Sequence, residues 1–166
     1  MNSKTCIKRI RSGGQSGVDR AALDFAKVNN IPIVGWCPKD GWAEDMHEAP
    51  GVMKLYPELR ETPSAVVDQR TVWNVRDADA TLVISGNSKS NGTDLTAATA
   101  KNMNKPYLIC DLNDSTNNAV QWLRGLNSNI ELNIGGPRES EEPGAYKKSY
   151  EFLENLLQTL SAEQAV

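Results

Sequence analysis

Strand-like and helix-like segments alternate along the whole chain, and this order restricts the fold more than any other feature of the sequence. Residues 80–85 (ATLVIS) form a continuous apolar run, typical of a parallel strand buried on both faces. Further strands are predicted at 7–11, 31–36, 107–112 and 130–134, and helices at 18–30, 63–77, 94–103, 116–125 and 144–160. The alternation predicts an α/β, Rossmann-like three-layer sandwich with a parallel central sheet and helices on both faces.

Length and charge restrict the function as well as the fold. With 166 residues, 39% of them apolar, we expect one ligand-binding domain over residues 1–166. The 18 Lys and Arg against 21 Asp and Glu give a net charge of −3 without long blocks, which disfavours nucleic-acid and membrane partners. The sequence lacks both an apolar run of about 20 residues and a signal-peptide-like start, so we expect a cytoplasmic location.

Three predicted strands end in turns rich in glycine and hydrogen-bond donors. The turns are SGGQSGVDR after residue 11, SGNSKSNGTD after residue 84 and IGGPRES after residue 133. Glycine backbones approach a ligand closely, and a helix that follows such a turn presents free N–H groups to an anion. Ligands of open parallel sheets bind at the carboxyl ends of the strands, so three such turns predict a site for an anionic, phosphate-bearing molecule. Each turn taken singly is equally compatible with a simple tight turn.

The segment at about 37–61 is too long for a simple connector, which predicts a functional loop. Lys39 and the preceding Trp36 could flank a flat ligand ring. Glu44 and Asp45 are weak candidates for a divalent metal site, because adjacent carboxylates usually lie on a solvated surface.

Three positions outside the turns carry alternative interpretations. Arg70 and Asn74 lie one helical turn apart and could reach the pocket mouth, although Arg70 could instead pair with Glu61 or Asp68. Cys37 lacks a histidine partner, which favours a buried structural cysteine over a nucleophile or metal ligand.

Several long blocks of the sequence resemble the molybdenum cofactor carrier family. They are SGGQSGVDRAALD, GWCPKDGWAED, QRTVWNVRDADATLVIS, NGTDLT, KPYLICDL and LNIGGPRES, and they occur in order over nearly the whole chain. This family lies in a wider Rossmannoid group with lysine-decarboxylase-like phosphoribohydrolases and DNA-processing-A-like proteins. The resemblance implies a Rossmann-like fold, a homo-oligomer (dimer or tetramer), and binding of molybdenum cofactor or a related phosphate-bearing, nucleotide-like ligand.

One position separates the chain from the phosphoribohydrolases. Their P-G-G-x-G-T-x-x-E turn corresponds here to SNGTDLT, and Thr96 stands where the glutamate would be. We therefore predict a carrier or binding protein without catalytic residues. A nucleotide-processing enzyme that uses Asp19, Glu44, Asp45 or Glu139 is one alternative, with a nucleotide or a divalent metal as cofactor, and a sensor of a nucleotide-derived ligand is another.

The predicted ligand-binding residues gather in the three turns, at the start of the long loop and on the helix at 63–77. They are Gly13, Gly14, Gln15, Ser16, Gly17, Arg20, Trp36, Lys39, Arg70, Asn74, Asn91, Gly92, Thr93, Gly135, Gly136, Pro137, Arg138, Glu139 and Ser140.

Overall fold

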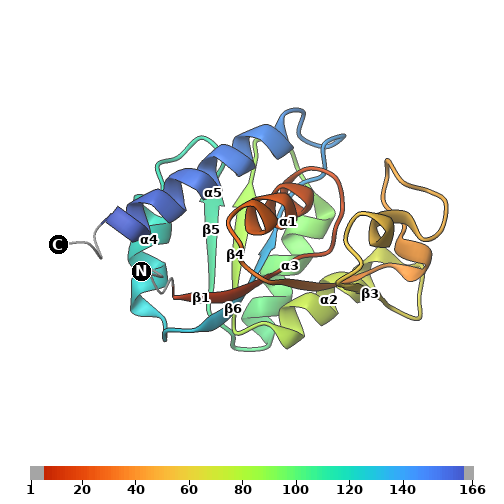
Figure 1. The fold of residues 1–166 in the computed structure, drawn as a ribbon, viewed down its shortest axis with the longest axis horizontal. Coiled ribbons are helices and arrows are strands. Elements are labelled where there is room, and N and C mark those ends of the chain that lie inside the picture. Colours follow the sequence, from red (N-terminus) through yellow and green to blue (C-terminus); the bar gives the residue numbers. More distant parts are fainter. Residues whose placement is uncertain (1–5, 163–166) are drawn as a thin grey trace.

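A computed structural model describes residues 6–162 of the chain and contains a six-stranded sheet in the order β3-β2-β1-β6-β4-β5 (Figure 1). All neighbouring strands pair in parallel. The strands are β1 (Ile7–Arg11), β2 (Ile33–Cys37), β3 (Leu59–Glu61), β4 (Ala80–Ser85), β5 (Tyr107–Asp111) and β6 (Ile130–Gly135). The helices are α1 (Val18–Val28), α2 (Val67–Asp77), α3 (Asn91–Asn102), α4 (Asn117–Gly125) and α5 (Ala145–Ala162).

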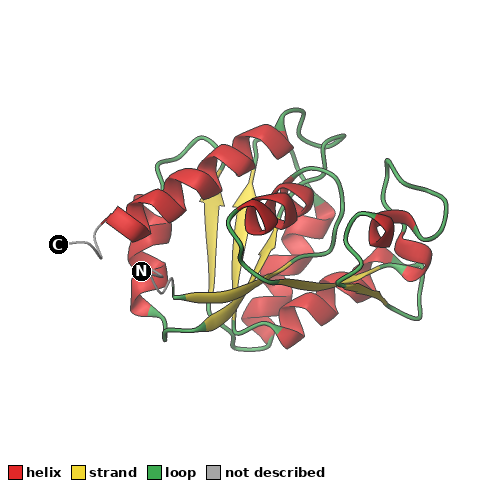
Figure 2. Cartoon of the chain, in the orientation of Figure 1, coloured by secondary structure: helices red, strands yellow, loops and turns green. Residues whose placement is uncertain are grey.

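The helices cover both faces of the sheet, so the predicted Rossmann-like sandwich is confirmed (Figure 2). Helices α1 and α4 pack against α5 on one face, and α2 packs against α3 on the other. The connections through α1 and α4 run towards the β3 edge of the sheet, and those through α2 and α3 run towards the β5 edge. Because crossovers between parallel strands are right-handed, opposite directions place the helices on opposite faces. Within residues 6–162, no helix is both long and apolar enough to cross a membrane.

The two faces of the sheet differ in polarity. Along β6, Leu132 and Ile134 belong to the large apolar cluster under α1 and α5, whereas the alternate residues Glu131 and Asn133 point to the opposite face. There the Glu131 carboxylate lies 2.5 Å from Nε of buried Arg11. The face under α2 and α3 is therefore buried but polar, and this determines the chemistry of the site described below.

The long segment after β2 is more ordered in structure than the sequence suggested. It contains short 3₁₀ turns at Lys39–Gly41 and Gly51–Lys54, and it ends in the edge strand β3, which was not predicted. Val52, Tyr56 and Leu59 bury their side chains in a second apolar cluster. The segment is therefore anchored by its own small core.

The predicted start of the helix at 63–77 is wrong, because α2 begins at Val67. Thr62 donates its N–H to the Cys37 carbonyl at 2.8 Å and so continues the pairing of β3 with β2. Extended backbone at Thr62 is also what the following proline favours, so the helix starts several residues later.

Candidate functional site

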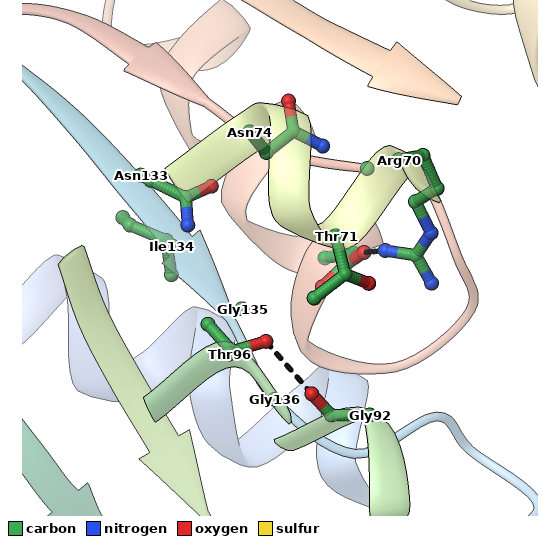
Figure 3. A pocket seen from close by; sticks show the side chains of 11 residues that line it. Arg70, Thr71, Asn74, Gly92, Thr96, Asn133, Ile134, Gly135 and Gly136 are labelled. Carbon is green, nitrogen blue, oxygen red and sulfur yellow. Dashed lines mark hydrogen bonds and ion pairs between the residues drawn. The ribbon is translucent and has the colours of Figure 1, made fainter. Parts of the chain in front are cut away.

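The three donor-rich turns follow β1, β4 and β6, which are neighbours in the sheet. From this point α1 leads towards β2 and α3 leads towards β5, so the turns surround a topological switch point, where α/β proteins place their ligands. A pocket lies there with about 30 Å³ of free space, roughly enough for one water molecule (Figure 3). It is lined by Gly13, Asp19, Arg70, Thr71, Asn74, Gly92, Thr96, Asn133, Ile134, Gly135 and Gly136.

An ion pair closes one side of this pocket. Arg70, the only cation among the lining residues, places Nη1 2.9 Å from Oδ2 of the buried Asp19. A Cβ atom on Gly13 would lie 2.2 Å from the same nitrogen, so the guanidinium crosses directly over the first turn. Burial raises the pKa of Asp19 despite the opposing charge of Arg70. Since the free space is so small, we expect a larger ligand to displace Arg70 from Asp19.

The second turn presents an open helix N-terminus to the pocket. Ser90 caps α3 by accepting the Thr93 N–H at 3.3 Å, which leaves the N–H groups of Asn91 and Gly92 without an acceptor among residues 6–162. A Cβ atom on Gly92 would meet nothing within 4 Å. Free N–H groups and the positive end of the helix dipole make this position suitable for an anion.

The donors of the first and third turns are instead engaged by the long loop. The Glu44 carboxylate accepts hydrogen bonds from the Ser16 hydroxyl, from the Ser140 hydroxyl at 2.5 Å and from the Ser140 N–H at 3.1 Å. The backbone N–H of Glu44 donates to the Gln15 side-chain oxygen at 2.9 Å. Arg138 lies 3.8 Å from the same carboxylate. We call this arrangement the Glu44 latch, because it ties the loop to both turns.

Arg20 is also engaged with the loop. Both of its terminal nitrogens lie 2.9 Å from the Asp45 carboxylate, and its Nε donates to the Gly14 carbonyl at 3.2 Å. Glu44 and Asp45, the candidate metal ligands, thus each have protein partners. In the described part of the chain no cluster of three or more His, Cys, Asp or Glu side chains could hold a metal ion.

The Glu44 latch predicts a measurable acid sensitivity. Burial alone would raise the pKa of Glu44, but hydrogen bonds from Ser140 and Ser16 outweigh it and lower that pKa below its usual value. A depressed carboxyl pKa contributes stability above the unfolded value, about 4.3, and this stability is lost as the pH falls through the folded pKa. Between pH 6 and pH 3, the melting temperature of E44Q should therefore fall less than that of the wild type.

The matched control for this measurement is E48Q, which changes an exposed glutamate of the same loop. Its melting temperature should follow the wild-type acid profile. Equal acid profiles for E44Q and the wild type would show that the latch carries no pH-dependent stability.

The remaining predicted residues lie outside the pocket lining. Trp36 is on the α2 side, where its Nε1 donates to Asp77 at 2.7 Å and its ring packs edge-on against Trp73 at 4.9 Å. Glu139 accepts the N–H groups of Gly144 and Tyr146 just before and within the first turn of α5. Lys39, Thr93 and Pro137 also fall outside the lining set, as do Gly14, Gly17 and Asn91.

Burial decides between the interpretations of Cys37. The side chain is fully buried, and desolvation together with the charge of Glu61 raises the pKa of its thiol to about 11. The thiol is therefore neutral at pH 7, as expected of a structural cysteine.

Sequence reasoning did not assign Asp19, Thr71, Thr96, Asn133 and Ile134 to the ligand site. A signal existed for Asn133, since it is a polar residue within an otherwise apolar strand, between Leu132 and Ile134. Thr71 gave no such signal, because its contribution depends on how α2 lies over the sheet.

Comparisons with known proteins agree with the fold. The model of the circularly permutated YpsA SLOG family matches residues 10–157. A solved structure of a protein from Syntrophus aciditrophicus SB, named "Putative molybdenum carrier protein", is 39% identical with a TM-score of 0.83. The match covers 95% of this chain and 99% of that one. No curated protein sequence matches this chain significantly. The family match includes all three turns, the long loop and the whole pocket lining.

Proposed function

The chain belongs to the circularly permutated YpsA SLOG family, and from this premise we propose that it is a carrier that holds molybdenum cofactor, or a related phosphate-bearing pterin, in the switch-point pocket. The observation that carries the proposal is the pairing of an open helix N-terminus with one arginine. Gly92, in the first turn of α3, and Arg70 line the same pocket, and Asn91 with its free N–H group directly precedes Gly92. The solved relative named as a molybdenum carrier supports the choice of ligand.

The residues present fit such a cargo. Its phosphate would lie between the start of α3 and Arg70, where a helix N-terminus and a guanidinium both favour negative charge. Glycines form the cradle: a Cβ atom on Gly136 would be 2.1 Å from the Ile84 carbonyl, so the backbone itself borders the site. Apart from the Asp19–Arg70 pair, the lining carries no charge, and Thr71 and Asn133 are able to hydrogen-bond a heterocycle.

Binding is better supported than turnover. Of the four carboxylates that an enzyme could use, only Asp19 lines the pocket, and Arg70 pairs with it. Glu44 and Asp45 are held by the latch and by Arg20, and Glu139 is bound to backbone N–H groups. A carrier needs a rigid anion site and a means of release rather than a free base or nucleophile.

Thermal unfolding under anaerobic conditions tests the proposal. A ligand that binds the folded state raises the melting temperature, by an amount set by its concentration relative to its dissociation constant. We expect molybdenum cofactor and neopterin monophosphate to raise it, and inorganic phosphate and molybdate to raise it less. A rise with nucleoside monophosphates alone would contradict the carrier and favour the nucleotide-processing alternative.

A further inference from the structure

Two asparagines line the pocket, and their side chains differ in how fully they are bonded. Asn74 uses both ends of its carboxamide on the Trp36 backbone, accepting the N–H at 2.8 Å and donating to the carbonyl at 2.9 Å. Asn133 makes a single long contact, in which its Nδ2 lies 3.4 Å from the Thr81 hydroxyl. The side-chain carbonyl oxygen of Asn133 has no hydrogen-bond partner among residues 6–162.

The position of Asn133 directs its free side-chain oxygen to the pocket. The residue is 3% exposed and lies in the middle of β6, on the polar face of the sheet. The side-chain oxygen of Asn133 is not sealed in the core, because the buried side-chain atoms without a hydrogen-bond partner among residues 6–162 are Arg9 Nε, Arg70 Nε and Thr93 Oγ1. It is therefore free to accept a hydrogen bond from a molecule in the pocket. The side chain borders the pocket, and Figure 3 shows it on the side opposite Arg70.

We infer that Asn133 determines specificity by pairing with the edge of a nitrogen heterocycle that carries a hydrogen-bond donor beside an acceptor, such as the lactam edge of a pterin. The inference rests on the proposed function and extends it. The Asn133 carbonyl oxygen accepts the ring N–H, and its Nδ2 donates to the ring carbonyl. With the phosphate between Gly92 and Arg70, the neutral heterocycle and the anionic phosphate of the ligand bind at opposite sides of the pocket.

Two probes separate recognition of the heterocycle from recognition of the phosphate. Neopterin monophosphate carries both a lactam edge and a phosphate, whereas ribose 5-phosphate carries the phosphate without a heterocycle. A bidentate amide pair discriminates by about tenfold to hundredfold. The wild type should therefore bind neopterin monophosphate at least about tenfold more tightly than ribose 5-phosphate. In N133L this preference should disappear, while the affinity for ribose 5-phosphate stays within about twofold.

A matched control tests whether Asn133 is merely structural. T81V removes the one partner that the Asn133 side chain has among residues 6–162, at a position that does not line the pocket. If the amide serves the ligand, T81V keeps the preference for the pterin phosphate. If T81V loses the preference as N133L does, the recognition role is overturned. N133S, too short to form both bonds, provides the same test should N133L unfold.

The outcomes also separate this inference from the proposed function. Equal wild-type affinity for both probes would overturn the role of Asn133 while leaving the anion site intact. Absence of binding by either probe would overturn the proposed function and the inference with it.

Discussion

Replacing Gly17 with alanine should lower the free energy of unfolding by about 3 to 5 kcal/mol, the sum of backbone strain and a backbone clash. Gly17 caps α1 with φ of 77° and ψ of −130°, a conformation that L side chains rarely adopt. A Cβ atom there would lie 2.4 Å from the Pro137 carbonyl oxygen. The same carbonyl accepts the Val18 N–H at 3.2 Å, so the first and third turns would have to separate.

Thermal unfolding measures this effect as a fall in melting temperature of about 6 to 20 °C for a domain of this size. The control is G92A, a glycine-to-alanine change within a helix and in open space. It should raise stability by about 0.5 to 1 kcal/mol. If G17A and G92A had the same melting temperature, the close packing of the two turns would be contradicted.

Replacing Gly92 with aspartate should abolish most ligand binding without harming the fold. The new carboxylate would lie at the start of α3, beside the proposed phosphate position. Repulsion of about 1.4 kcal/mol or more between the two anions would raise the dissociation constant at least tenfold. Negative charge in the first helical turn interacts favourably with the helix dipole. A Cβ atom at Gly92 would meet nothing within 4 Å. The melting temperature without ligand should therefore be equal to or higher than that of the wild type.

The matched control is G92N, which has the same shape as G92D but no charge. It should retain more binding of neopterin monophosphate than G92D, because only the charge differs. Equal affinities for G92D, G92N and the wild type would place the anion elsewhere. Equal losses in G92D and G92N would show that crowding, rather than an anion at this helix terminus, is responsible.

Most of the fold could be predicted from local pattern. The strand at Ala80–Ser85 has the predicted bounds, because a continuous apolar run bounded by polar turns has few other interpretations. The edge strand β3 could not be predicted, since only Leu59 of its three residues is buried. The start of α2 was misjudged because Thr62-Pro63 is compatible with both a helix start and an extended strand end.

The position of the candidate pocket at the turns could be predicted from the sequence, but its lining could be predicted only in part. The turns meet because β1, β6 and β4 are neighbours, which the alternating pattern and the glycines together suggested. Which donors face the pocket depends on contacts distant in sequence. Ser16 and Ser140 are bound by Glu44, and Arg20 is bound by Asp45, and no local pattern encodes those pairs. Phosphate binding at the turns and assembly into a dimer or tetramer stay predictions.

A crystal structure with molybdenum cofactor, prepared anaerobically, would show directly whether the switch-point pocket binds the cofactor. We expect the phosphate between the Gly92 N–H and the Arg70 guanidinium, with Arg70 turned away from Asp19. Cofactor bound at another surface, with the 2.9 Å pair of Arg70 and Asp19 intact, would contradict this expectation.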